Sequence, residues 1–168
     1  MYYFIWNPAA GKGESERALP VIKLFMDERG LQYTLLKTER AGHAAELAKK
    51  AAEDPEAMAV VAIGGDGTIL ETASGLIDAD LPLACIPLGN GNDFMSNIID
   101  LRKYRTVEEK TKRCLEILLR GQRGQHSHPP PQHFQERVRI RIRGKVNDYI
   151  YPLPGCSIAP LPRCTRNI

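Results

Sequence analysis

A glycine-rich turn that holds one carboxylate is the strongest chemical signal in the chain. The run Ile63-Gly64-Gly65-Asp66-Gly67-Thr68-Ile69-Leu70-Glu71 follows an apolar stretch and opens a helical pattern. Backbone N–H groups at a helix start bind anions such as phosphate, and glycines let the anion come close. Asp66 supplies a ligand of the type that Mg²⁺ prefers beside phosphate oxygens. The turn therefore predicts a phosphate and magnesium site; the alternative is a plain turn with Asp66 as helix cap.

Two further polar loops follow apolar stretches. The loop Pro87-Leu88-Gly89-Asn90-Gly91-Asn92-Asp93-Phe94 repeats the combination of small residues, amides and a carboxylate, although Asn-Gly pairs also form ordinary turns. The loop Asn7-Pro8-Ala9-Ala10-Gly11-Lys12-Gly13 comes after the first apolar stretch. It is not a Walker P-loop, because Trp6 stands where the first glycine is required and Gly13 where Ser or Thr is required. A bare turn remains the alternative for either loop.

Strands and helices alternate regularly over the first 120 residues and position these loops. Strands are predicted over residues 3–6, 32–37, 57–63 and 83–86, and helices over 15–29, 42–52, 68–77 and 107–120. Gly30 is expected to end the first helix. Such alternation predicts a three-layer α/β fold, in which helices cover both faces of a parallel sheet. Ligands bind such sheets at the carboxyl ends of the strands, which is where the three loops lie.

The basic charge of the chain is concentrated in its last part. The net charge is +3 over 168 residues, but residues 1–124 hold 16 Lys and Arg against 18 Asp and Glu. Residues 125–168 hold 7 against 2 and also seven of the twelve prolines. We therefore expect no nucleic-acid binding by the domain, and divide the chain into a nucleotide-binding domain (1–121) and a poorly ordered Pro- and Arg-rich tail (122–168). One strand is predicted over residues 137–143.

The composition indicates a cytoplasmic protein. Hydrophobic residues make up 43% and charged residues 26% of the chain, and no apolar run is long enough to cross a membrane. The four cysteines show no C-x-x-C spacing, which favours reduced thiols over a disulfide framework.

In order and spacing, the three motifs N-P-x-x-G-K-G, G-G-D-G-T-x-x-E and P-L-G-x-G-N-D-F resemble the catalytic domain of diacylglycerol kinases and related lipid kinases. The resemblance covers roughly residues 1–120. It implies a fold like the N-terminal domain of NAD kinase and phosphofructokinase, with ATP and Mg²⁺ as cofactors. It also implies phosphorylation of a lipid hydroxyl, as in diacylglycerol, by a peripheral protein at a membrane surface. A homodimer is left open.

The same resemblance assigns the site residues. Asp66 and Asp93 would be catalytic, with Asp66 also holding the metal and residues 90–93 facing the reaction centre. The nucleotide would be bordered by Asn7, Pro8, Ala9, Ala10, Gly11, Thr38, Gly65, Asp66, Gly67, Thr68, Ile69, Leu70, Glu71, Asn90, Gly91 and Asn92. His43 stands at a position that is often histidine in the family; a surface residue at a helix start is the alternative.

Two departures from the family pattern stand out. Asn90 replaces the usual threonine of Gly-Thr-Gly-Asn-Asp by an amide, which still forms hydrogen bonds but is larger. Family members also continue into a β-rich domain with an acidic base in an Asp-Gly-Glu-like motif, whereas here Asp148 is the only aspartate after Asp100.

We therefore expect a truncated kinase that binds ATP weakly and turns over poorly, and a tail that is either a frame-shifted product or a genuine basic tail. An NAD kinase-like enzyme, a non-catalytic nucleotide-binding remnant and a fragment that does not fold stably are the alternatives.

Overall fold

A four-stranded parallel sheet runs through the centre of the fold, in the strand order β2-β1-β3-β4. The computed structural model describes residues 1–96, 100–123, 136–142 and 145–151. The strands are β1 (Tyr2–Trp6), β2 (Tyr33–Lys37), β3 (Ala59–Gly64) and β4 (Leu83–Pro87), and each lies within two residues of its predicted bounds. The predicted parallel sheet is therefore confirmed.

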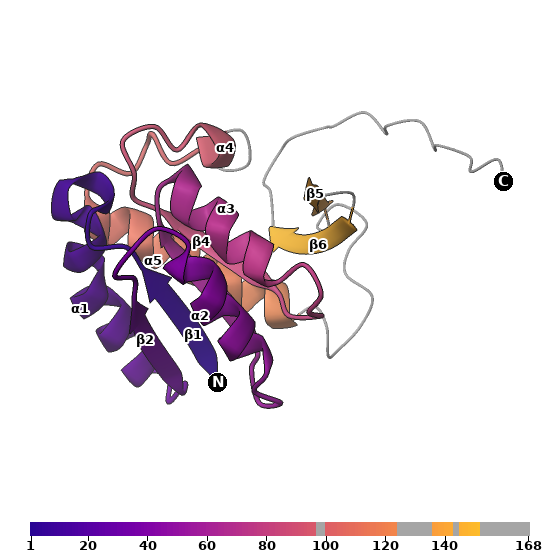
Figure 1. Cartoon of the computed structure of the whole chain (residues 1–168). Coiled ribbons are helices and arrows are strands. Elements are labelled where there is room, and N and C mark those ends of the chain that lie inside the picture. Colours follow the sequence, from indigo (N-terminus) through magenta and orange to yellow (C-terminus); the bar gives the residue numbers. More distant parts are fainter. Residues whose placement is uncertain (97–99, 124–135, 143–144, 152–168) are drawn as a thin grey trace, which may run out of the picture.

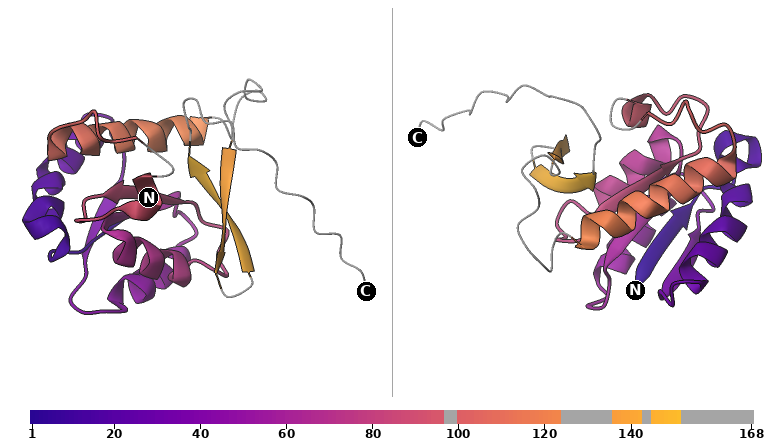
Figure 2. Two further views of the ribbon diagram at one scale, coloured as in Figure 1. Left: turned by 90° about the horizontal axis from the view of Figure 1, so that it is seen from above. Right: turned by 180° about the vertical axis from the view of Figure 1, so that it is seen from behind.

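Helices cover both faces of this sheet (Figures 1 and 2). On one face lie α1 (Glu14–Asp27) and α5 (Val107–Arg123), and on the other lie α2 (His43–Ala52) and α3 (Asp66–Gly75). The three-layer arrangement predicted from the alternating pattern is thus confirmed. Two short elements were not predicted: the 3₁₀ helix η1 (Ala10–Gly13) and the single-turn helix α4 (Asp93–Ser96).

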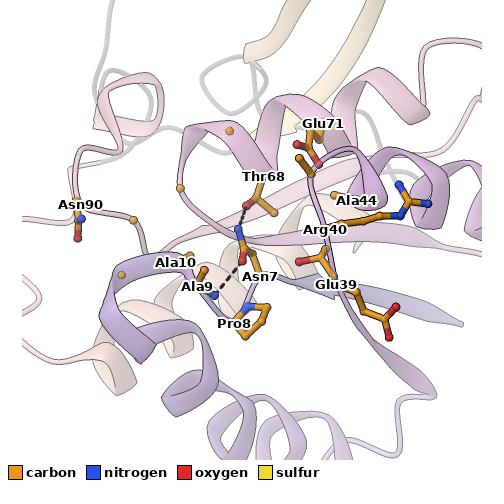
Figure 3. Close-up of a pocket in the computed structure, with 16 residues that line it drawn as sticks. Asn7, Pro8, Ala9, Ala10, Glu39, Arg40, Ala44, Thr68, Glu71 and Asn90 are labelled. Atoms are coloured by element: carbon orange, nitrogen blue, oxygen red, sulfur yellow. Dashed lines mark hydrogen bonds between the residues drawn. The ribbon is translucent and has the colours of Figure 1, made fainter.

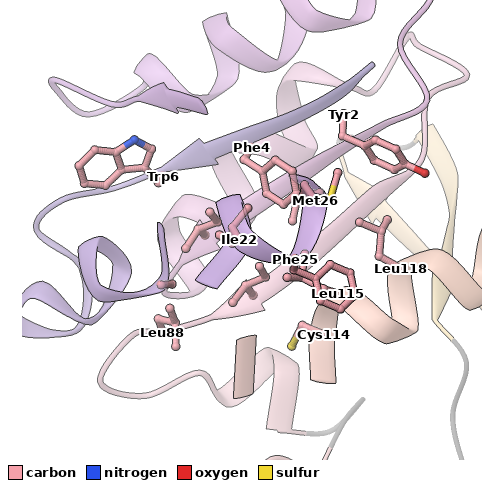
Figure 4. Close-up of a cluster of buried hydrophobic side chains, with 14 of the residues drawn as sticks. Tyr2, Phe4, Trp6, Ile22, Phe25, Met26, Leu88, Cys114, Leu115 and Leu118 are labelled. Atoms are coloured by element: carbon pink, nitrogen blue, oxygen red, sulfur yellow. The ribbon is translucent and has the colours of Figure 1, made fainter. Parts of the chain in front are cut away.

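Alternate side chains of the central strands supply two hydrophobic cores. Phe4 points toward α1 and α5, where it packs with Ile22, Met26 and Leu115 (Figure 4). Its neighbour Ile5 lies in the opposite core with the alanines of α2. Every residue of β3 is buried, as expected for an inner strand whose sequence is a continuous apolar run.

The helices α2 and α3 approach each other closely because their contact residues are small. A side chain at Gly75 would collide with the backbone carbonyl of Ala45. Ala44, Ala48 and Ala51 form the buried stripe of α2. This packing fixes α3, the helix that begins at the glycine-rich turn.

Helix ends follow their local sequence signals. Gly30 adopts φ 62° and ends the turn after α1, as predicted. At the start of α5, Thr106 and Glu109 form a capping box: the Thr106 hydroxyl accepts the Glu109 amide at 3.1 Å and the Glu109 carboxylate accepts the Thr106 amide at 3.2 Å.

The strand order creates a switch point between β1 and β3. From β1 the chain moves outward to β2, and from β3 it moves outward to β4 on the other side. The loops that leave the carboxyl ends of β1 and β3 therefore diverge, and a crevice opens between them.

Part of the last segment forms a β-hairpin. Strands β5 (Glu136–Ile142) and β6 (Lys145–Tyr151) pair antiparallel, with Glu136 opposite Tyr151. The strand predicted over 137–143 is confirmed over residues 137–142, residue 143 lies outside the described residues, and β6 was not predicted. The expectation of a poorly ordered tail falls largely on residues 124–135, 143–144 and 152–168, which lie outside the described residues. The domain boundary after residue 121 stays a prediction.

Candidate functional site

A cavity of about 520 Å³ opens at the carboxyl ends of the strands, at the switch point. Its walls come from the loops after all four strands. In Figure 3, Asn90 lies at one end of the view, Glu39 and Arg40 lie at the other, and Asn7 and Thr68 lie between them. The lining residues are Asn7, Pro8, Ala9, Ala10, Gly11, Thr38, Glu39, Arg40, Ala41, Ala44, Gly65, Gly67, Thr68, Glu71, Gly89 and Asn90.

Asn7 joins the first loop to the start of α3. Its side-chain oxygen accepts the Ala9 amide at 2.9 Å, and its side-chain nitrogen donates to the Thr68 hydroxyl at 3.2 Å (Figure 3). The Ser15 hydroxyl donates to the Asn7 carbonyl at 2.6 Å. These bonds use both ends of the amide, so the loop after β1 is held against the glycine-rich turn.

Glycines allow three loops to touch: the first loop after β1, the second loop (the glycine-rich turn) after β3, and the third loop after β4. Gly11 adopts φ 60°, and a side chain there would collide with the Leu88 carbonyl. A side chain at Gly89 would collide with the Cα atom of Gly65. The first loop therefore contacts the third, and the third contacts the second, through positions that have no room for a Cβ atom.

The start of α3 presents unpaired backbone donors. Gly65 precedes the helix, and no side chain caps it. The first N–H groups of a helix have no intrahelical acceptor, and the helix dipole makes this end electropositive. Gly67 is exposed, and an added Cβ atom would meet no atom within 4 Å. An anion can thus approach the backbone here without obstruction.

Asp66 ties the second loop to the third. Its Oδ2 accepts the Asp93 amide at 2.8 Å and lies 3.5 Å from the Phe94 amide. Its Oδ1 is buried and has no hydrogen-bond partner within the described part of the chain. Asp66 does not line the cavity, so its visible role is to hold the backbone at the start of α4.

Asn92 shapes the third loop from within. Its side-chain oxygen accepts the Gly89 amide at 2.9 Å, and its side-chain nitrogen donates to the Gly89 carbonyl at 2.7 Å. It adopts φ 55°, a left-handed conformation that asparagine tolerates better than most residues. Asn90, two residues earlier in the chain, is left exposed at the cavity wall.

Backbone dipoles dominate the electrostatics of the cavity. Its charged lining side chains are Glu39, Arg40 and Glu71, and no lysine of the described residues lines it. Arg40 is already engaged, because its guanidinium lies 2.7 Å from the Glu46 carboxylate. A polyanion in this cavity would therefore depend on N–H groups and a cation of its own.

Comparison with known proteins assigns the family. Over residues 1–127 the chain matches the diacylglycerol kinase catalytic domain. The chain belongs to this family. It is 36% identical over 94 residues to the diacylglycerol kinase of Staphylococcus carnosus (strain TM300), covering 54% of this chain and 30% of that protein. It is 29% identical over 110 residues to sphingoid long-chain bases kinase 1 of Arabidopsis thaliana, covering 58% and 14%.

Solved structures agree with this assignment. A diacylglycerol kinase from Bacillus anthracis str. Sterne superposes with a TM-score of 0.53 and 26% identity, over 68% of this chain and 39% of that chain. This likeness to a diacylglycerol kinase supports the expected NAD kinase-like fold. The chain spans well under half the length of each of these proteins.

The cavity brings together most of the residues that the sequence indicates for a diacylglycerol kinase domain. The lining includes eleven of them: Asn7, Pro8, Ala9, Ala10, Gly11, Thr38, Gly65, Gly67, Thr68, Glu71 and Asn90. Five others lie elsewhere. Ile69 is buried in the core beside α2, Leu70 is exposed, Asp66 bonds to the third loop, and Gly91 and Asn92 line a second cavity.

Sequence reasoning did not identify Glu39, Arg40, Ala41, Ala44 and Gly89 as cavity residues. The first four follow Thr38 at the carboxyl end of β2. Because ligands bind at the carboxyl ends of parallel strands, this position could have identified them. His43 does not line the cavity: its Nδ1 accepts the Glu39 amide at 3.1 Å and so fixes the loop into α2. Asp93 is exposed at the start of α4.

Proposed function

We propose that this cavity binds ATP and that the domain catalyses phosphoryl transfer from ATP to the hydroxyl of a lipid such as diacylglycerol. The observation that carries the proposal is the meeting of three glycine loops at the open start of α3, in a chain of the diacylglycerol kinase catalytic domain family. A volume of about 520 Å³ suits a nucleotide-sized ligand.

The cavity favours one orientation of the nucleotide. The phosphates would lie at the Gly65–Thr68 turn, where N–H donors and the positive end of the α3 dipole are available. The nucleoside would extend toward Thr38 and Ala41 at the end of β2. Asn90 would meet the phosphate end through its amide, in place of the hydroxyl usual in the family.

The acidic residues near the turn fit a magnesium ion carried by the nucleotide. No group of three or more potential metal ligands occurs among the described residues, so a resident metal centre finds no support there. Magnesium bound to ATP needs only one or two carboxylates. The buried, unpartnered Oδ1 of Asp66 makes this residue the candidate ligand, directly or through water. The ion would neutralise charge on the phosphates.

Positioning would supply most of the catalysis. The lipid oxygen attacks the γ-phosphorus, the bond to the leaving ADP oxygen breaks, and the hydroxyl proton passes to a base. Asp93 is exposed, and its backbone amide bonds to Asp66 in the glycine-rich turn, so we propose it as a residue near the reaction centre. The acidic base that family members carry in an Asp-Gly-Glu-like motif has no match in this sequence, because Asp148 is the only aspartate after Asp100 and is followed by Tyr149. We therefore expect slow turnover by this chain.

The acceptor is a lipid, so we infer that the enzyme works at a membrane surface. Within the described residues, no helix is both long and apolar enough to cross a membrane. Light scattering of the purified chain measures whether two copies associate in solution.

Calorimetric titration of ATP, with and without Mg²⁺, tests the nucleotide site. Asp66→Asn keeps an oxygen for the Asp93 amide but removes the charge, so it should lose the Mg²⁺-dependent gain in affinity and keep binding of free ATP. Asp66→Ala should lose both, because the third loop is also released. Asp80→Ala, an exposed change in the loop between α3 and β4, is the control. Equal metal dependence in all four proteins would remove Asp66 from the metal site.

A further inference from the structure

A second cavity of about 510 Å³ lies next to the third glycine loop. Gly91 and Asn92 line it, whereas the preceding Gly89 and Asn90 line the first cavity. Successive residues of one loop therefore contribute to two separate spaces. The remaining walls come from the end of β4, from α4, from residues 100–104 and from the first turn of α5.

The lining of this second cavity combines polar and apolar residues, and its charged groups are mostly cationic. Pro87 and Met95 are buried, and Leu101 is half-buried. The charged lining residues are Asp100, Arg102 and Lys110. They leave a net charge of one positive unit in the cavity.

Asp100 does not neutralise this cavity, because it is already paired with Arg102. The Arg102 Nε lies 3.0 Å from one carboxylate oxygen, and these hydrogen bonds hold the pKa of Asp100 below its usual value. The Arg102 side chain is 92% exposed, and a guanidinium keeps further donors when it binds one carboxylate. The pair thus contributes free N–H donors at the mouth.

Lys110 is a half-buried cation that has no acidic partner among the described residues. Its helix neighbours three and four positions away are Thr106, Val107, Arg113 and Cys114, none of which is acidic. The two nearby acids on α5 are engaged elsewhere. Glu108 pairs with Lys112 at 2.8 Å, and Glu109 caps the helix.

We propose that this second cavity binds the phosphate group of an anionic amphiphile, with Lys110 as its charge partner. A half-buried lysine without an acidic partner can form a charge-assisted hydrogen bond, and phosphate oxygens provide the acceptor. Three apolar residues also line the cavity, Pro87, Met95 and Leu101, and the half-buried Leu101 would contact the hydrocarbon part attached to such a head group. Binding here does not require that the chain transfers phosphate, so it stands apart from the kinase proposal.

Nuclear magnetic resonance titration of the full chain tests this site residue by residue. The probes are inorganic phosphate, soluble dihexanoyl phosphatidate and, as a zwitterionic control, dihexanoyl phosphatidylcholine. Soluble ligands are used because the excess of positive charge in residues 125–168 would bind anionic vesicles by itself. We expect phosphatidate to shift the amide signals of Gly91, Met95 and Lys110, and phosphatidylcholine to leave them in place.

Charge variants on one helix supply matched comparisons. Lys110→Gln should weaken phosphatidate binding about tenfold, the order expected from one lost charge-assisted bond. Lys112→Gln, on the same helix but outside the cavity, should leave it unchanged, and Lys110→Arg should retain it. Tighter binding of phosphatidate than of inorganic phosphate would identify a lipid head group as the source, and equal binding would identify free phosphate. No shifts at the cavity, or equal losses in the two glutamine variants, would overturn the proposal.

Discussion

Replacing Gly67 by alanine should stabilise the chain and weaken its binding of ATP. Gly67 lies in the first turn of α3, and an added Cβ atom meets no atom within 4 Å. Alanine is favoured over glycine within helices by about 0.5–1 kcal/mol. For a chain of 168 residues this corresponds to a rise in melting temperature of about 1–4 °C.

Gly67 lines the cavity, and an added methyl group would stand in open space there. It would hold a phosphate away from the first N–H groups of α3. One hydrogen bond to a charged group contributes about 1.5–3 kcal/mol, so the dissociation constant of ATP should rise by roughly tenfold to a hundredfold. A higher melting temperature together with weaker ATP binding would indicate a blocked site, whereas a damaged fold would lower both stability and affinity.

Thermal unfolding and calorimetric titration of MgATP measure both quantities on the same sample. Ser74→Ala, on α3 but away from the cavity, is the control and should bind ATP as the wild type does. Wild-type ATP affinity in Gly67→Ala would refute the reasoning, because the phosphates would then not approach this turn. A fall in the melting temperature of Gly67→Ala would contradict the open space around a Cβ atom at this position.

Three further outcomes follow from the structure. Gly89→Ala should lower the free energy of unfolding by about 1–3 kcal/mol in denaturant titration, because its Cβ atom would collide with Gly65; an unchanged value would show that the two loops do not touch. Burial raises the pKa of the Cys114 thiol to about 12, so iodoacetamide should not label Cys114 in the folded chain at mildly alkaline pH, as mass spectrometry of digests would show; rapid native labelling would contradict its burial. The Tyr3 hydroxyl donates to Asp54 at 2.6 Å and lowers the pKa of that carboxyl, so the stabilisation is present above the usual value of 3.8 and is lost as the pH falls through the lowered pKa. Tyr3→Phe should therefore lower the melting temperature at neutral pH but not in acid, and a pH-independent difference would count against the bond.

The sheet could be predicted from the sequence because its signals are local. The continuous apolar run of β3 marks an inner strand, and Gly30 marks the end of α1. The 3₁₀ helix after β1 could not be predicted in this way, because it depends on left-handed conformations at Gly11 and Lys12. Gly11 adopts its conformation against the Leu88 carbonyl, which is 77 positions away in the chain.

Helical periodicity could have refined the candidate site. Gly67, Thr68 and Glu71 share the side of α3 that faces the cavity, whereas Ile69 turns into the core and Leu70 turns outward. A spacing of 3.6 residues per turn predicts this division. The bond between Asp66 and the Asp93 amide could not have been found, because it depends on how two loops from different strands meet.

The most direct test of the account is a crystal structure of the chain with a non-hydrolysable ATP analogue and Mg²⁺. The account predicts the β- and γ-phosphates against the backbone of residues 65–68, with the adenosine extending toward Thr38. Density for the nucleotide at any other surface, with the space between the loops after β1 and β3 left free of it, would contradict the central claim.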